Sequence, residues 1–440
     1  MEFANSILKT RSAGLCSGCG ACAAACAKKA IAVVRNNGGY LVPEVDLGKC
    51  SNCGACLKVC PSSADLVLEV TGDDPLVGEA KAGYIGHAVD AGYRIGGQSG
   101  GVASAIIRHL LEVDEIDGAI VNVFDVTIKR NVPQLITSPA EIPLSFGSYY
   151  AQSAVVNECL KHVGKRLAVV TLGCQAEALR KYLQLHPSVR NNYFIIGLFC
   201  AGNYSGDYID ALIDEAVVDK DSIKTFRFRY KHQSVALWPG KVLIATDQRQ
   251  IILPSSRRTR IKKLYEVPRC RFCFDQLNVF ADISIGDPWG IEKPNDSQGE
   301  SVLLVRTERG HEVICDAIKS RWLDLKDLPV AQIVKGQTVH TRLARDLMMA
   351  ERVADELGLP KPYIPAGGKM ASGVGKVSED IRDRILFSRK QMLSLTREEV
   401  LEERKMLRRK MIREAILRTV FSFPWRFVSK VVSALRKGCV

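Results

Sequence analysis

The chain has 440 residues, of which 47% are hydrophobic and 25% charged, a composition typical of a soluble globular protein with several domains. No apolar run approaches the roughly 18 residues that a membrane-spanning helix needs, so we expect nothing that crosses a bilayer. The fifteen cysteines, with no export signal before them, favour a cytoplasmic, reducing compartment in which thiols serve as metal ligands instead of forming disulfides.

Two cysteine runs of the form C-x2-C-x2-C-x3-C dominate the first sixty residues. Paired runs of this kind are typical of two 4Fe-4S clusters, with the fourth cysteine of each run ligating the other cluster. We therefore assign one cluster to Cys16, Cys19, Cys22 and Cys60, and the other to Cys50, Cys53, Cys56 and Cys26. Disulfides and zinc are poorer alternatives, because no secretory signal precedes the runs and zinc sites usually use pairs of C-x2-C.

The segment between the two runs, residues 31–46, is typical of a β-hairpin around an Asn-Asn-Gly-Gly turn. The turn-forming sequence TGDDP then begins at Thr71. We therefore expect residues 1–72 to form a small α+β two-cluster ferredoxin domain.

Residues 73–345 alternate β-rich runs with helical patterns, which predicts an α/β domain with a largely parallel sheet. A glycine-rich loop with Gly96, Gly97, Gly100 and Gly101 opens one of the helices. Such a loop brings backbone N–H groups and a helix N-terminus close to an anion, but it can equally be a plain helix cap.

Four further cysteines follow strands or turns of this domain. Cys174 comes after a strand predicted at residues 167–171, and Cys200 follows the next strand, where the open edge of an α/β sheet binds ligands. Cys270 and Cys273 form a C-x2-C that alone is compatible with zinc, redox chemistry or simple burial. Together the four thiolates suffice for a third cluster.

A basic run lies directly before this C-x2-C. It comprises Arg257, Arg258, Arg260, Lys262 and Lys263. Either these side chains are solvated on a loop, or they form an anion-recognising rim at the mouth of a substrate site.

Residues 346–440 are expected to form a linker followed by a basic helical tail. Residues 377–440 hold sixteen Lys or Arg against eight Asp or Glu, so much of the net charge of +13 lies there. The last segment mixes aromatic and basic residues, which suits an amphipathic helix on an anionic membrane surface or one packed on its own domain or a twin subunit. The sequence pattern fits both alternatives.

As a set, GGQSGGVASAII, SFGSYYAQS, LGCQAEAL, LFCAGNYS and CRFCFDQLNVFADISIGDPWG resemble, in order and spacing, the β-subunit family of hydrogenases and dehydrogenases that use the deazaflavin coenzyme F-420. The family includes the plant 7-hydroxymethyl chlorophyll a reductase. The resemblance covers about residues 1–345, with the ferredoxin domain fused at the N-terminus. It implies an α/β flavin domain that binds FAD beside a 4Fe-4S cluster.

The resemblance also implies which residues hold these groups. The family's cluster cysteines fall on Cys174, Cys200, Cys270 and Cys273. Its flavin-contacting segments fall on Gln98, Ser99, Gly100 and Gly101 and on Gly147, Ser148, Tyr149 and Tyr150. Relatives usually have Lys at the position of Tyr149, Pro at Gly173 and a polar residue at Ala201, so the substrate is left open between F-420 and another compound.

From these features we expect an iron–sulfur flavoprotein oxidoreductase. It would pass electrons between a two-electron organic substrate at FAD and one-electron 4Fe-4S clusters or ferredoxin. One alternative is an electron-transfer subunit whose catalytic partner is another chain. Others are a ferredoxin-dependent reductase of a lipid-linked or bulky substrate at the inner membrane face, and a binding protein whose clusters only hold the fold.

The expected partners are ferredoxin or another redox protein, the organic or deazaflavin substrate and a second copy of the chain, but no nucleic acid. No residue is identified as a proton donor.

Overall fold

The structure is a computed structural model of the chain, and it describes residues 5–232, 236–291, 298–364, 379–393 and 396–421. Residue contacts divide the chain into two compact units, Met1–Ser394 and Leu395–Val440. The second unit contains one described helix, α14 (Arg397–Phe421). The aromatic and basic segment for which we expect an amphipathic helix, residues 422–440, lies outside the described residues.

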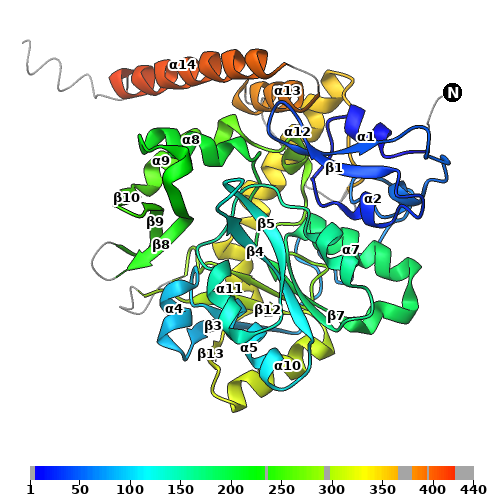
Figure 1. Cartoon of the computed structure of the whole chain (residues 1–440), viewed down its shortest axis with the longest axis vertical. Coiled ribbons are helices and arrows are strands. Elements are labelled where there is room, and N and C mark those ends of the chain that lie inside the picture. Colours follow the sequence, from blue (N-terminus) through cyan, green and yellow to red (C-terminus); the bar gives the residue numbers. More distant parts are fainter. Residues whose placement is uncertain (1–4, 233–235, 292–297, 365–378, 394–395, 422–440) are drawn as a thin grey trace, which may run out of the picture. The chain divides into compact units, whose positions relative to one another are not determined.

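The first unit is built around an eight-stranded sheet with the strand order β13-β3-β12-β11-β7-β6-β4-β5 (Figure 1). The strands are β3 (Ala82–Ala88), β4 (Gly118–Asp125), β5 (Arg130–Ile136), β6 (Leu167–Thr171), β7 (Tyr193–Leu198), β11 (Ile283–Gly286), β12 (Ser301–Val305) and β13 (Leu323–Asp327). The four central strands β4, β6, β7 and β11 pair in parallel. The outer pairs are antiparallel, so the sheet is mixed and its parallel part lies at the centre.

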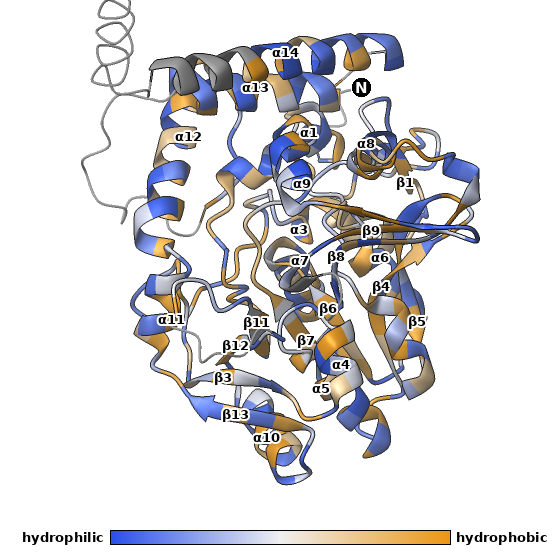
Figure 2. Cartoon of the chain, turned by 90° about the vertical axis from the view of Figure 1, so that its left-hand side faces the viewer, coloured by the Kyte–Doolittle hydropathy of each residue, from blue (hydrophilic) through white to orange (hydrophobic). Residues whose placement is uncertain are grey.

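Helices cover both faces of this sheet, which explains why its central strands are hydrophobic along their whole length (Figure 2). On one face lie α5 (Val102–Glu112) and α10 (Glu308–Lys319). On the other lie α6 (Val155–Cys159), α7 (Gly173–Leu185), α11 (Val330–Gly336) and α12 (Ala344–Glu356). In β6, Ala168 belongs to the hydrophobic core on the face covered by α5 and α10. Leu167 and Val169 belong to the core on the opposite face, because successive side chains of a strand point to opposite faces.

The cysteine-rich N-terminal region packs directly on this second layer of helices. It contains α1 (Leu8–Ser12), α2 (Ala21–Ala24), β1 (Ile31–Arg35), β2 (Leu41–Val45) and α3 (Ala55–Lys58). β1 and β2 form the predicted antiparallel hairpin. Leu15, Ala21 and Val59 share one hydrophobic core with Val155 of α6, and the N–H of Val156 donates to the carbonyl of Cys19 at 3.1 Å.

A second, three-stranded antiparallel sheet stands with α8 and α9 to one side of the large sheet (Figure 1). Its strands are β8 (Ile223–His232), β9 (Ala236–Thr246) and β10 (Gln250–Leu253), and the two helices are α8 (Asp207–Glu215) and α9 (Ser255–Ile261). The remaining α-helix of the α/β region, α4 (Ala91–Gly96), precedes the glycine-rich loop. The turn with the C-x2-C is a short 3-10 helix, η6 (Pro268–Phe272).

Helix α13 (Glu379–Leu393) lies in the region that we assign to the tail, and it packs on the first unit. The carbonyl of Met392 accepts a bond from Asn36 of the hairpin at 2.7 Å. Arg389 donates to the carbonyls of Ala13 and, at 3.0 Å, of Pro360. The helix therefore fastens the cysteine-rich region to the end of α12.

Candidate iron–sulfur and cofactor sites

The four cysteines assigned to the first cluster, Cys16, Cys19, Cys22 and Cys60, line one small cavity. Burial raises the pKa of the Cys19 thiol to about 11, and it also raises the pKa of Cys22 well above its ordinary value, with the thiols of Cys16, Cys19 and Cys60 adding to that shift. Backbone N–H groups point at the sulfurs, including that of Ser62 at 3.4 Å from Cys60 Sγ. Cys19, Cys22 and Cys60 are buried and Cys16 is half-buried. Four such thiols with N–H donors are what a 4Fe-4S cluster requires.

The other four ferredoxin-type cysteines lie nearer the surface. Cys26 Sγ accepts a bond from the N–H of Ala30 at 3.3 Å. Burial raises the pKa of Cys56, with a smaller contribution from the thiol of Cys53. Cys53 itself is exposed, and the N–H of Ala55 lowers its pKa. Cys50 is half-buried. This second set therefore reaches the solvent, whereas the first is enclosed.

The third set of thiols, Cys174, Cys200, Cys270 and Cys273, meets at the carboxyl edge of the large sheet. Cys174 lies in the first turn of α7 and Cys200 directly after β7, while Cys270 and Cys273 come from the η6 turn. Burial raises the pKa of Cys174 well above its ordinary value, and the neighbouring thiols of Cys273, Cys270, Cys19 and Cys200 raise it further. The first set lies beside this third one, because Arg269 of the η6 turn donates to the carbonyl of Pro61, directly after Cys60, at 3.3 Å.

Three buried charges lie between the first and third sets of thiols. Lys181 of α7 is 0% exposed, and its ammonium group lies 3.0 Å from Glu177 and donates to the carbonyl of Cys60 at 2.9 Å. Arg269 donates to the Ser62 hydroxyl at 2.9 Å from the other side. Burial raises the pKa of Glu177, and the two cations offset this only in part. The turn after Cys60 is thus held by cations from two other segments.

A cavity of about 250 Å³ opens beside the third set of thiols. Seven of the eight residues that resemblance assigns to flavin contact line it: Gln98, Ser99, Gly101, Gly147, Ser148, Tyr149 and Tyr150. Gly100 lies behind the lining, where its N–H donates to Ser301 Oγ at 2.9 Å. Cys200 also lines the cavity, so this thiol faces both the cavity and the other three cysteines.

The glycine-rich loop places the N-terminus of α5 at this cavity. Gly101, the residue before the helix, has φ 75°, and a Cβ at this position would meet the carbonyl oxygen of Tyr93 at 2.2 Å. Only glycine fits such a position. The free N–H groups of the first helical turn and the helix dipole are therefore available to an anionic group in the cavity.

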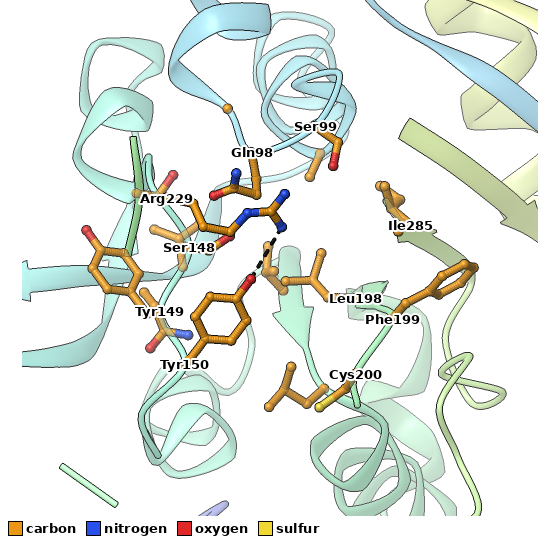
Figure 3. Close-up of a pocket in the computed structure, with 18 of the residues that line it drawn as sticks. Gln98, Ser99, Ser148, Tyr149, Tyr150, Leu198, Phe199, Cys200, Arg229 and Ile285 are labelled. Carbon is orange, nitrogen blue, oxygen red and sulfur yellow. Dashed lines mark hydrogen bonds between the residues drawn. The ribbon is translucent and has the colours of Figure 1, made fainter. Parts of the chain in front are cut away.

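A buried ion pair forms another part of the wall. Arg229 of β8 is 5% exposed on its side chain and lies 2.6 Å from the carboxylate of Asp287, which follows β11. Arg229 also donates to the hydroxyl of Tyr150 at 3.3 Å, and the two side chains point toward each other in Figure 3. Ser99 and Trp238 both donate to Asp287. Burial opposes ionisation, but Arg229 and these donors hold the pKa of Asp287 below its ordinary value.

The remaining wall combines apolar surface with two unsatisfied polar atoms. Val121, Val170, Leu198, Phe199 and Ile285 provide the apolar part. The buried atoms Asn122 Oδ1 and Thr171 Oγ1 make no hydrogen bond with any residue that the structure describes. A buried polar atom normally has a partner, so this wall is suited to a ligand with a flat apolar body and polar edges.

In the basic run before the C-x2-C, two arginines lie on the surface and a third lies against the cavity wall. Arg257 and Arg260 pair with Glu215 on the surface. Arg258 instead places its guanidinium 5.0 Å above the ring of Tyr150, a residue of the cavity wall.

The sequence does not identify two further charged side chains of the cavity as binding residues. Arg229 and Asp287 lie 58 positions apart and pair only through the fold. Asp287 stands in the Gly-Asp-Pro-Trp-Gly turn, which the sequence marks as a tight turn and not as a binding residue.

Comparison with known families identifies these regions. Residues 84–161 and 164–330 match the N-terminal and C-terminal parts of the coenzyme F-420 hydrogenase/dehydrogenase beta subunit, and residues 15–64 match a 4Fe-4S dicluster domain. The chain belongs to the coenzyme F-420 hydrogenase/dehydrogenase beta-subunit family. The family resemblance and the two-cluster domain expected from the sequence are thereby confirmed.

Individual relatives of this beta-subunit family protein are named as redox enzymes or their subunits. It is 24% identical over 278 residues to the coenzyme F-420 hydrogenase subunit beta of Methanococcus voltae, covering 60% of this chain and 92% of that protein. It is 25% identical over 236 residues to the chloroplastic 7-hydroxymethyl chlorophyll a reductase of Oryza sativa subsp. japonica, covering 50% of this chain and 46% of that enzyme. These names support an oxidoreductase role with iron–sulfur electron transfer.

A solved structure shares the fold of this family member. A chain of the F-420-reducing [NiFe] hydrogenase complex from Methanosarcina barkeri superposes with a TM-score of 0.50 at 23% identity, covering 67% of this chain and 99% of that chain.

In the described part of this chain, none of the helices combines the length and the apolar character of a membrane span.

Proposed function

We propose that this protein is an iron–sulfur flavoprotein oxidoreductase with three 4Fe-4S clusters. It would move electrons between a two-electron organic substrate at FAD, either F-420 or another compound, and a one-electron protein carrier. The family and its dicluster domain support the iron–sulfur part. FAD, the third cluster and the substrate go beyond what the family alone establishes.

The cavity residues are suited to FAD. The N-terminus of α5 and the hydroxyl group of Ser148 offer donors to the phosphate groups. The apolar wall formed by Leu198 and Ile285 suits a flat ring system, and Thr171 Oγ1 lacks a partner that a ring edge would supply. When bound, FAD supplies the exchange between paired and single electrons that iron–sulfur centres alone do not provide.

The donor chemistry of the third thiol set is suited to a cluster. All four side chains are thiols, and the N–H of Asn203 points at Cys270 Sγ at 3.3 Å. No three His, Cys, Asp or Glu side chains among the described residues are arranged around a single metal ion. In a 4Fe-4S site, the thiolates bind different irons of one cubane, so they stand further apart than the ligands of one ion.

One observation carries the proposal: the thiols form a continuous series from the cavity to the surface. Cys200 lines the cavity and belongs to the third set. Lys181 of α7, the helix that also carries Cys174 of that set, donates to the carbonyl of Cys60 of the first set at 2.9 Å. Cys22 and Cys60 of the first set pack with Cys56 of the second in one hydrophobic cluster. This chain of residues spans the distance between an organic ligand and the solvent.

Anaerobic purification with measurement of iron, sulfide and flavin tests the proposal. We expect about twelve irons and one FAD per chain from the three four-iron sites. Cys270→Ser/Cys273→Ser should retain about eight irons, because it leaves the two ferredoxin-type sites intact. Cys159→Ser is the matched control, since Cys159 is a buried thiol of α6 outside all three sets. About eight irons and no FAD in the wild-type protein would contradict the proposal.

Titration of the loaded protein with reduced F-420 then tests the substrate. Bleaching of the flavin and cluster absorbance would identify F-420 as a substrate, and bleaching by reduced ferredoxin alone would indicate another organic compound. A second candidate function is an electron-transfer subunit of a larger complex, which the relatives named as subunits favour. That candidate predicts full cofactor loading but no substrate turnover by the isolated chain.

A further inference from the structure

The cysteine set nearest the solvent is surrounded by lysines. Cys53 is exposed, whereas Cys19, Cys22 and Cys60 of the first set are buried. The series of thiols described above therefore reaches the surface at Cys53, and a one-electron carrier would approach most closely there.

Four exposed lysines come from the segments that hold this set. Lys28 and Lys29 follow Cys26, Lys49 precedes Cys50, and Lys58 ends α3, two positions after Cys56. The loops are joined, because the N–H of Asp46 donates to the carbonyl of Ala30 at 2.8 Å. We call Lys28, Lys29, Lys49 and Lys58 the lysine patch.

Within the part of the chain that the structure describes, most of this positive charge has no paired carboxylate. Lys49 pairs with Asp46 at 2.9 Å. Among the described residues, Lys28, Lys29 and Lys58 have no carboxylate within ion-pair distance. Leu47, beside Lys49, exposes 51% of its surface. An apolar side chain among unpaired cations is the usual composition of a transient docking surface, since charge steers the encounter and a small apolar contact holds it.

We propose that the lysine patch, with Leu47 and Cys53, is the docking surface for a small acidic one-electron carrier protein of the ferredoxin or flavodoxin class. This inference rests on the proposed function, because it assumes that the cysteine sets hold clusters. In each encounter the reduced carrier loses one electron and the centre held by Cys26, Cys50, Cys53 and Cys56 gains it, or the reverse. No bond forms or breaks, and two encounters supply one two-electron substrate.

The test measures how fast two reductants reduce the anaerobically purified full-length protein in stopped-flow experiments. One is a reduced acidic 2Fe-2S ferredoxin, and the other is a viologen with one sulfonate arm, whose one-electron-reduced form carries no net charge. The patch variant is Lys28→Gln/Lys29→Gln/Lys58→Gln. The matched control is Lys319→Gln/Lys326→Gln/Lys335→Gln, which removes the same charge from exposed positions on α10, β13 and α11.

At low salt, the patch variant should accept electrons from ferredoxin about tenfold more slowly than wild type, because steering by charge changes association rates by this order or more. Added salt should slow the wild-type reaction far more than that of the patch variant. The control variant should keep the wild-type rate, and viologen should reduce all three proteins equally.

An equal ferredoxin rate in the patch and control variants would overturn the docking surface. So would loss of binding to anionic vesicles in the patch variant with an unchanged ferredoxin rate, because the lysines would then serve a membrane. If viologen fails to reduce the wild-type protein, the cluster assignment fails, and with it the proposed function. A slow viologen reaction in the patch variant alone would indicate damage to the site and would also count against docking.

Discussion

Lys181 offers the sharpest test of how the thiol sets are held together. Its ammonium group is fully buried, lies 3.0 Å from Glu177 and donates to the carbonyls of Cys60 and Ser63 at 2.9 and 3.2 Å. Lys181→Met would leave the carboxylate of Glu177 buried without its nearest cation. Breaking a buried pair in this way costs about 3–5 kcal/mol of unfolding free energy. In Lys181→Met/Glu177→Leu the buried charge is gone, so we expect the double variant to recover more than half of this loss.

Urea unfolding followed by circular dichroism measures these differences. With an m-value of about 3 kcal/mol per molar urea, the midpoint of Lys181→Met should fall by about 1–1.7 M. Lys161→Met is the control, because Lys161 pairs with Glu158 at 2.7 Å on the surface and such pairs contribute less than about 1 kcal/mol. The reasoning is refuted if Lys181→Met behaves like this control, or if the double variant is as unstable as the single one.

Three further predictions concern other parts of the first unit. Asp287→Asn removes the countercharge of buried Arg229 at the cavity wall, so the amount of bound FAD should fall several-fold while iron is retained. Flavin and iron per chain are measured, and an equal loss of both would contradict the prediction. Burial lowers the pKa of His109 from 6.5, so below about pH 6.5 the unfolded chain binds a proton more readily than the folded chain does. The urea midpoint should therefore decrease as the pH is lowered from 7 to 5, and His109→Gln should make the midpoint less dependent on pH in this range. Arg389→Met leaves the carbonyls of Ala13 and Pro360 without their donor, so it should cost about 2 kcal/mol and speed tryptic cleavage within α13; an unchanged cleavage rate would contradict it.

The sequence predicts best those features that depend on neighbouring residues. The strand at residues 167–171 is present as β6 with the same bounds, because a short β-branched run before a glycine turn leaves little choice. The hairpin of β1 and β2 is present for a similar reason. By contrast, β12 is buried throughout and pairs antiparallel on both sides. A continuous apolar strand carries no information about its direction, so the mixed character of the sheet could not be read from the sequence.

The candidate site, like the fold, can be predicted from the sequence only in part. Cysteine spacing and family resemblance indicate the twelve thiols and seven further residues of the cavity wall. The pairing of Arg229 with Asp287 joins the small sheet to a turn of the large one, and a lone arginine in a β-strand gives no hint of such a partner. Helix α13 was likewise assigned to a basic tail from its charge, although Ile381 and Ile385 are buried in the main core.

The shared core between the cysteine-rich region and α6 and α7 limits how this domain can be exchanged. Gln152 donates to the carbonyl of Ser17 at 2.9 Å and accepts from the N–H of Leu41 at 3.0 Å, so one side chain from the α/β region replaces part of the ferredoxin region's internal bonding. A free-standing ferredoxin grafted onto this scaffold would lack the matching surface. A change of redox partner would therefore be accommodated in the solvent-facing loops, since the inner half of the domain is packed against its host.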